Sequence, residues 1–311
     1  MERMTFIKLA ETVLREEKRP LSIGEMWKIA VEKNYDKEFS KLGKTPWATL
    51  GARVYVEMQN NKHSNFYKVS SRPSKFFLRD LSMEGISLEE VPKQDKSRKE
   101  DKIEFLESDL HPFLSYFSNL FLNAFTKTIN HSKSGKKSFG EWVHPDMVGF
   151  YFPIEEWNSD VLDFSNAIRN TAIKIFSFEL KRELNFSNLR ESFFQAVSNS
   201  TWANEGYLVA SEISKDEEFR DEVRRLVGSF GIGIIELDIS DPDSSSIMFP
   251  ARQKEYLDWE TMNKLADMNS DFLNFLQSVR KDLSNKEIRK ERYNEILLRE
   301  KLIKMISKKN K

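Results

Sequence analysis

Residues 173–181 read IKIFSFELK, and this stretch decides the fold of the larger part of the chain. A short run of β-branched and aromatic residues without helical spacing is typical of a buried strand. Side chains two residues apart lie on the same face of a strand, so Glu179 and Lys181 point into one space. A second strand is expected at 147–152, directly after Asp146. If the two strands are neighbours in a sheet, Asp146 can meet Glu179.

Helices and strands alternate on both sides of this stretch. The expected helices cover residues 110–125, 189–197 and 217–227, and the expected strands cover 147–152, 172–180, 207–212 and 232–238. This order predicts a mixed sheet with helices on its faces. Because 33 positions separate Asp146 from Glu179, an insertion around 157–170 must leave the sheet and return. We assign residues 103–279 to this α/β domain.

Residues 1–80 have the pattern of a separate and smaller unit. Apolar spacing and turn signals indicate a helix at 5–17, a second helix after Ser22, a third from Thr45-Pro46, and strands at 65–69 and 75–79. Ser22 with Glu25 forms a capping box, and Thr45 is the expected N-cap before Pro46. Three helices followed by a hairpin is the order of a winged helix. The whole chain is therefore predicted to be an α+β or α/β multidomain protein.

Two further segments are rich in charged residues and lack a regular pattern of apolar residues. Residues 81–102 are polar and highly charged, and we interpret them as a solvated linker. Residues 280–311 are expected to form a basic C-terminal helix, with imperfectly heptad-spaced apolar residues from Asn285 onward. This helix is either an arm that follows a DNA duplex or an oligomerisation helix, and the spacing leaves both open.

The charged residues are unevenly distributed along a chain that has no net charge. The 311 residues include 49 Lys and Arg and 49 Asp and Glu, yet the net charge is +6 over residues 1–80, −13 over 81–279 and +7 over 280–311. Basic ends can bind a polyanion, while the acidic middle can hold metal-binding carboxylates. The absence of cysteine excludes disulfides, thiolate metal sites and a cysteine nucleophile.

The sequence argues against a membrane span, a signal peptide, a nucleotide-binding loop and a histidine metal site. The longest stretch without charged residues, 110–126, contains serine and asparagine and is too polar to span a bilayer. The first residues lack the apolar core of a signal peptide, so we expect a soluble cytoplasmic protein without a membrane partner. The glycine-rich residues 228–233 lack the lysine of a phosphate-binding loop, so no nucleotide cofactor is expected. No two of the four histidines have metal-ligand spacing, and we expect a structural role for His144.

Two carboxylates that converge beside a lysine can form a binding site for a divalent cation. Asp146 and Glu179 would supply oxygen ligands to Mg²⁺, which prefers such ligands and keeps several waters. The cation stabilises charge on a phosphate, and Lys181 orients or helps to deprotonate an attacking water. The alternative is a surface ion pair, because the Glu-x-Lys pattern also occurs at 16–18 and 100–102.

Pro145-Asp146 followed by Glu179-Leu180-Lys181 resembles the PD-(D/E)XK nuclease superfamily, and residues 178–199 are similar to its restriction-endonuclease branch. The resemblance implies a restriction-endonuclease-like α/β core with a mixed sheet. In that core Asp146 and Glu179 would bind Mg²⁺, with Mn²⁺ as a substitute. Leu180 would add its backbone carbonyl as a ligand, and Lys181 would act on the water.

The same resemblance implies roles for two further residues. Glu107, at the start of the first helix of the domain, would add a carboxylate to the site, whereas a helix cap or a solvated residue is the alternative. Gln195 lies on the helix after the Glu-x-Lys strand, where several relatives place a glutamine near the site.

The N-terminal part resembles the HARE-HTH winged helix at residues 21–27, 44–47, 65–69 and 77–80. This module is fused to such nucleases in bacterial proteins of the HrgA type, and the two resemblances together cover most of residues 5–250. Expected DNA contacts are phosphate contacts from Lys44, Lys62 and Arg72 and base-edge contacts from Thr49 and Arg53, with Thr45 beside them. Winged helices also bind proteins, so a protein partner stays open.

The two resemblances together imply a bacterial Mg²⁺-dependent DNA endonuclease of restriction type. Its winged helix would sense a DNA sequence or a base modification, such as methylation or hydroxymethylation of double-stranded DNA, in defence against phage. Because duplex cleavage needs two active sites, we expect a homodimer at least on DNA. The alternative is a catalytically inactive DNA-binding regulator or a protein-interaction module.

Overall fold

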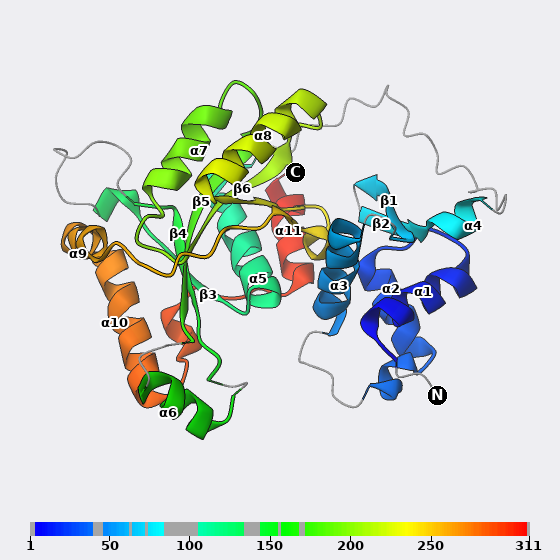
Figure 1. Ribbon diagram of the computed structural model, residues 1–311, viewed down its shortest axis with the longest axis horizontal. Coiled ribbons are helices and arrows are strands. Elements are labelled where there is room, and N and C mark those ends of the chain that lie inside the picture. The colour runs from blue at the N-terminus through cyan, green and yellow to red at the C-terminus, as the bar shows by residue number, and fades with distance from the viewer. Residues whose placement is uncertain are drawn as a thin grey trace. The chain divides into compact units, whose positions relative to one another are not determined.

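The computed structural model describes residues 4–39, 46–61, 64–71, 74–83, 105–133, 144–154, 157–167 and 172–309. Two units divide the chain, and Figure 1 shows their elements. Unit 1 comprises Met1–Glu104, Asp238–Ser245 and Arg299–Lys311, and unit 2 comprises Phe105–Leu237 and Ser246–Leu298. Residues 84–102 of the expected linker lie outside the described residues. No helix within the described ranges is long and apolar enough to cross a membrane.

Unit 1 begins as a winged helix, which confirms the prediction. Its elements are α1 (Phe6–Glu17), α2 (Ile23–Glu32), the 3-10 helix η1 (Tyr35–Glu38), α3 (Pro46–Asn60), β1 (Phe66–Ser71), β2 (Ser74–Leu78) and α4 (Arg79–Met83). β1 and β2 pair antiparallel, and Leu21 forms an isolated bridge to Phe76. Ser22 and Glu25 form the expected capping box at the start of α2. Thr45, the expected N-cap of α3, lies outside the described residues.

Unit 1 also contains a short segment and a helix from the other end of the chain. These are Asp238–Ser245, with the 3-10 helix η5 (Pro242–Ser244), and α11 (Arg299–Lys309). The Arg299 guanidinium lies 3.0 Å from Asp241 Oδ1 and 3.2 Å from Asp243 Oδ2. Tyr55 of α3 donates a hydrogen bond of 3.3 Å to the Ser244 carbonyl. These contacts explain why the two pieces belong to the same unit as the winged helix.

The C-terminal segment differs from the expected continuous basic helix. Its elements are α10 (Ser270–Asn285), the 3-10 turn η6 (Lys290–Arg292) and α11. α10 ends at Asn285 and is capped by Lys286, which adopts a left-handed φ of 51°. The fully buried Asp282 explains the break, because a buried carboxylate needs donors and Tyr293 supplies a 2.7 Å hydrogen bond as the chain folds back. The prediction of one helix over 280–311 is wrong, and these residues divide between the two units.

Unit 2 is built on a mixed sheet of six strands, in the order β3-β4-β5-β6-β7-β8. The strands are β3 (Phe125–Thr128), β4 (Met147–Tyr151), β5 (Lys174–Leu184), β6 (Glu205–Ile213), β7 (Gly233–Glu236) and β8 (Ser246–Phe249). β5, β6 and β7 are parallel to one another, and the other neighbours pair antiparallel. The mixed sheet is confirmed. β3 and β8 were not predicted, and the helix expected at 110–125 ends before β3.

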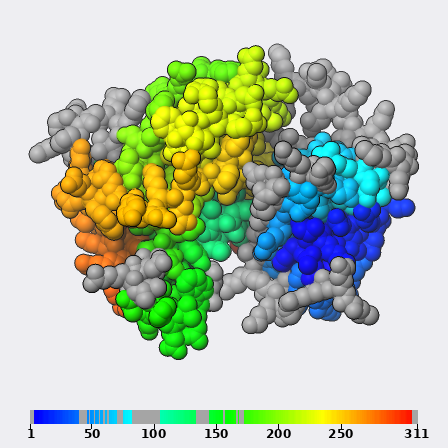
Figure 2. Space-filling view, in the orientation of Figure 1, coloured from blue at the N-terminus to red at the C-terminus, as the bar shows by residue number. Residues whose placement is uncertain are grey.

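Helices cover the sheet and complete two apolar cores. They are the 3-10 helix η2 (Glu107–Leu110), α5 (His111–Phe121), α6 (Ser159–Ala167), α7 (Leu189–Ser198), α8 (Glu217–Phe230) and α9 (Trp259–Met268) with α10. Phe193 of α7 and Phe219 of α8 pack with Leu208 of β6, and these two helices form the upper part of unit 2 in Figure 2. Phe275 of α10 packs with Phe150 of β4 in the other core. α6 is the expected insertion between β4 and β5.

Candidate active site

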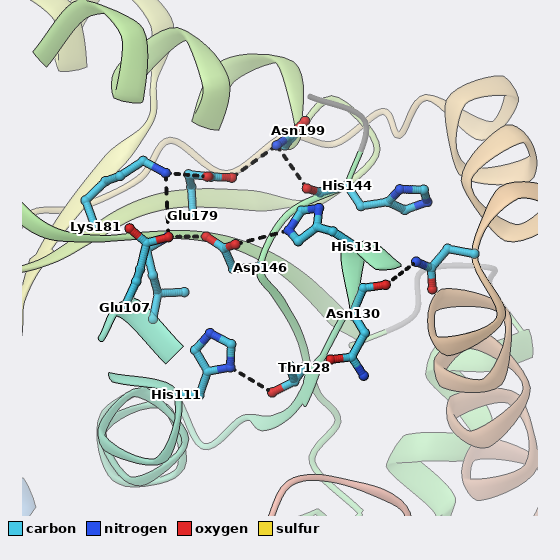
Figure 3. Close-up of polar contacts among 12 residues, drawn as sticks. Glu107, His111, Thr128, Asn130, His131, His144, Asp146, Glu179, Lys181 and Asn199 are labelled. Atoms are coloured by element: carbon cyan, nitrogen blue, oxygen red, sulfur yellow. Dashed lines mark hydrogen bonds and ion pairs between the residues drawn. The ribbon is translucent and has the colours of Figure 1, made fainter. Parts of the chain in front are cut away.

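The pairing of β4 with β5 creates the site. Met147 pairs with Phe178 in an antiparallel register, so Asp146 and Glu179 follow as opposite residues at the start of β4. The Leu180 amide donates a 2.7 Å hydrogen bond to Asp146 Oδ2, which fixes the carboxylate against β5. The expectation that the two strands are neighbours is confirmed. Figure 3 shows the side chains of Asp146, Glu179 and Lys181 converging there.

Glu179 is a buried carboxylate with two side-chain donors. Only 1 % of its surface is exposed. Its Oε1 accepts a 2.9 Å hydrogen bond from Lys181, and its Oε2 accepts a 3.0 Å hydrogen bond from Asn199. Burial and the negative charge of Asp146 raise the pKa of Glu179 to about 7, against the opposing effects of Lys181 and Asn199. The site therefore has a deficit of positive charge around its two carboxylates.

Lys181 lies between two acidic side chains. Its ammonium group is 2.9 Å from Glu179 Oε1 and 4.0 Å from Glu107 Oε1. Burial acts to lower the pKa of Lys181, but the charges of Glu179, Glu107 and Asp146 outweigh burial and raise it. Glu107 reaches the site from η2, as expected, and burial raises its pKa. Lys181 is thus held as a cation by its neighbours.

Asp146 receives a second hydrogen bond from a residue that the sequence did not single out. His131 Nε2 lies 3.2 Å from Asp146 Oδ1. Burial acts to raise the pKa of Asp146, but the hydrogen bonds from His131 and the Leu180 amide, with the charge of Lys181, outweigh burial and lower it. The hydrogen bond to Asp146 in turn raises the pKa of His131. No motif marks His131, because its place depends on β3, a strand that the sequence pattern conceals.

Asn199 is the second residue that sequence reasoning missed. It caps the C-terminal end of α7 and is 2 % exposed. Its Nδ2 donates to Glu179 Oε2 and, at 3.2 Å, to the backbone carbonyl of His144. The expected Gln195 lies one turn earlier on α7, and no hydrogen bond within the described residues joins its side chain to the carboxylates. Asn199 therefore occupies the position beside Glu179 that was expected for Gln195.

Two further histidines border this group. His144 is buried, its Nε2 lies 3.2 Å from the Leu265 carbonyl and its ring packs edge-on against Phe272. These contacts agree with the structural role expected for it. His111 Nδ1 lies 3.2 Å from Thr128 Oγ1, and burial lowers its pKa.

The donor set can be compared with the needs of a divalent cation. Each of the four oxygens of Asp146 and Glu179 accepts a hydrogen bond, and a carboxylate oxygen has a second lone pair that can bind a cation. Mg²⁺ binds through one or two carboxylates and keeps several waters, so this pair fits it. Over the described part of the chain no group of three His, Asp or Glu side chains is arranged to hold a metal. Leu180 contacts Asp146 through its amide, and its expected role as a carbonyl ligand stays a prediction.

The expected DNA-contacting residues belong to unit 1. Leu50 and Val54 of α3 are buried in the core of the winged helix, whereas Thr49 and Arg53 are exposed. Residues four apart on a helix lie on the same face, so Thr49 and Arg53 form one exposed patch. The remaining expected contacts, Lys44, Thr45, Lys62 and Arg72, lie outside the described residues.

Comparison with known proteins identifies the class of the N-terminal domain. Residues 4–81 match the HARE-HTH family, a helix-turn-helix domain whose description names ASXL and restriction endonuclease among its sources. The chain therefore carries a HARE-HTH domain, which is a DNA-binding module. No curated protein and no solved structure matches the chain.

Proposed function

We propose that the protein is a Mg²⁺-dependent DNA endonuclease of restriction type with a PD-(D/E)XK-like core. The observation that carries this proposal is the convergence of Asp146, Glu179 and Lys181 where β4 meets β5. Two neighbouring carboxylates in a mostly buried position are unfavourable without a cation to bind. Groups with such perturbed ionisation gather at functional sites.

The residues of the site divide the work of phosphodiester hydrolysis. Asp146 and Glu179 hold Mg²⁺, or Mn²⁺ in its place, with the Leu180 carbonyl as a further ligand. The bound cation supplies stabilisation of the charge that develops on the phosphate. Lys181 is held by Glu179 and Glu107 and donates a hydrogen bond that orients the attacking water.

The HARE-HTH domain supplies recognition of the substrate. Thr49 and Arg53 on α3 face base edges and phosphates of double-stranded DNA. The feature that the domain reads is a sequence or a base modification such as methylation or hydroxymethylation. Two copies of the chain act together on a duplex, because each active site hydrolyses one strand. Cleavage of marked foreign DNA would serve defence against phage.

Cleavage assays test this proposal directly. Unmodified, methylated and hydroxymethylated plasmids are incubated with the wild type in Mg²⁺ or Mn²⁺, and Lys181→Ala is compared with it. Lys174→Ala is the matched control. Lys174 lies on the same strand, and its ammonium group is 3.1 Å from Glu205 Oε1, an ion pair that does not involve Asp146 or Glu179. We expect metal-dependent cutting that falls by at least about 100-fold in Lys181→Ala and persists in Lys174→Ala.

The opposite result would favour a different function. If no plasmid is cut while the wild type and Lys181→Ala bind DNA equally, the protein is better explained as a DNA-binding regulator with an inactive core. Loss of cutting in both lysine variants would show only that replacing a lysine of β5 by alanine disrupts the protein. In that case Glu107→Gln, a change outside the strand, decides between the two functions.

A further inference from the structure

His131 lies on a short turn that is fixed at both ends. The turn is the 3-10 helix η3 (His131–Lys133), which begins three residues after the last residue of β3. The pairing of β3 with β4 continues to Asp146, whose carbonyl accepts a 2.9 Å hydrogen bond from the Ile129 amide. The chain thus leaves the sheet two residues before His131 and beside the carboxylate that His131 contacts.

Asp271 at the start of α10 holds the residues on either side of His131. Its Oδ2 accepts hydrogen bonds from the Asn130 amide at 3.2 Å and from Asn130 Nδ2 at 2.9 Å. Its Oδ1 accepts one from Lys133 at 2.7 Å. Asn269 adds a 3.0 Å hydrogen bond from its Nδ2 to the Asn130 carbonyl. The backbone around His131 is therefore set by α10, independently of the His131 ring.

The contact between His131 and Asp146 has a defined direction. An ionised carboxylate can only accept hydrogen bonds, so the proton lies on His131 Nε2. The Leu180 amide occupies the other oxygen of the same carboxylate. Two donors from different elements restrict the rotation of the Asp146 side chain, and a carboxylate oxygen that accepts one hydrogen bond can still bind a cation through its second lone pair. A partner outside the ligand set that orients a ligand in this way tunes metal affinity in many proteins.

We propose that His131 is a positioning residue, which holds Asp146 in the orientation that binds the divalent cation. This inference rests on the proposed function. Because 47 % of the His131 side chain is exposed, removing the ring affects little buried surface and the fold should persist. The effect should therefore appear in metal binding and not in stability.

Calorimetric titration of the full chain with Mn²⁺, without DNA, tests this role. Four proteins are compared: the wild type, His131→Ala, His131→Gln and Ser132→Ala. Glutamine can restore a side-chain N–H donor, and Ser132 is an exposed neighbour on the same turn that serves as the matched control. We expect about tenfold weaker Mn²⁺ binding for His131→Ala, recovery to within about threefold for His131→Gln and no change for Ser132→Ala. Thermal unfolding in the absence of metal should coincide for all four.

The outcomes separate this inference from the proposed function. Unchanged Mn²⁺ affinity in His131→Ala, with a wild type that binds Mn²⁺ and cuts DNA, overturns the role of His131 alone. A wild type that neither binds Mn²⁺ nor cuts DNA overturns both. Equal weakening in Ser132→Ala would also overturn it, because the effect would then come from the turn and not from the ring.

Discussion

The side-chain amide of Asn199 donates a hydrogen bond of 3.0 Å to Oε2 of Glu179. The same nitrogen reaches the His144 carbonyl at 3.2 Å, two residues before Asp146. One side chain at the end of α7 thus links the strand that carries Glu179 to the segment that carries Asp146. The backbone carbonyl of Asn199 accepts 2.8 Å hydrogen bonds from Ser177 and Trp202, so the linking residue is itself held in place.

Replacement of Asn199 by alanine is expected to destabilise the metal-free protein. The buried Glu179 carboxylate and the His144 carbonyl both lose a donor, and the loss of a hydrogen bond to a buried acceptor costs about 1–3 kcal/mol. Urea denaturation measures the free energy of unfolding. Asn263→Ala on the exposed side of α9 is the control and should change it by less than about 0.5 kcal/mol. Equal losses in the two variants would argue against this link.

Glu179 should make the stability of the metal-free protein depend on pH. Its pKa is raised from an ordinary value of 4.5 to about 7, so between these values the folded state keeps a proton that the unfolded state releases. The free energy of unfolding therefore falls as the pH rises from about 4.5 to about 7, and above this range the contribution is constant. At 1.36 kcal/mol for each pKa unit, the loss amounts to about 3 kcal/mol.

Comparison of the wild type with Glu179→Gln isolates this contribution, because glutamine does not ionise. Between pH 5 and pH 8 the wild type should lose about 3 kcal/mol relative to the variant in urea denaturation without metal. Addition of Mg²⁺ at pH 8 should stabilise the wild type and leave the variant nearly unchanged. A difference between the two proteins that stays constant with pH would contradict the raised pKa of Glu179.

The parts of the fold that the sequence predicts are those with long or strongly patterned segments. β5 has eleven residues and a buried centre, and α1 and α2 have clear caps. β3 and β8 have four residues each and lie in short apolar runs, whereas β7, which is equally short, lies in the longer apolar stretch from Ile232 to Leu237. In addition, β3 follows an aromatic helix so closely that its apolar residues extend the helical pattern. The break after α10 depends on Asp282 and its partners, and such long-range contacts leave no local signal.

The same distinction applies to the candidate site. Glu179 and Lys181 could be predicted because strand alternation puts them on one face, and Asp146 because it directly precedes another strand. Glu107 was expected only from the family resemblance. His131 reaches Asp146 only through the pairing of β3 with β4, which was not predicted. Asn199 reaches Glu179 from a helix end, one turn beyond the expected Gln195, and the position of a helix end is the least predictable feature of a helix.

Arg299 is expected to stabilise unit 1 through its two acidic partners. Asp241 and Asp243 are mostly buried, and Arg299→Ala leaves both without this cation, which should cost about 1–3 kcal/mol. Thermal unfolding should therefore occur at a lower temperature than in the wild type. Lys301→Ala on an exposed position of α11 removes the same charge and should have little effect. A similar shift for the two variants would mean that the net charge of α11 matters and the contact does not.

Arg53 is expected to contribute to DNA affinity without supporting the fold. It is exposed on α3 beside Thr49, and loss of one arginine contact to a base or phosphate costs about 1–3 kcal/mol. Arg53→Ala should therefore weaken binding of a duplex about tenfold in fluorescence anisotropy at fixed salt, with unchanged thermal unfolding. Lys28→Ala is the matched control, because it removes one charge from an exposed position on α2 of the same domain. If both variants weaken binding equally, the domain attracts DNA through its overall charge, and α3 is not the helix that reads it.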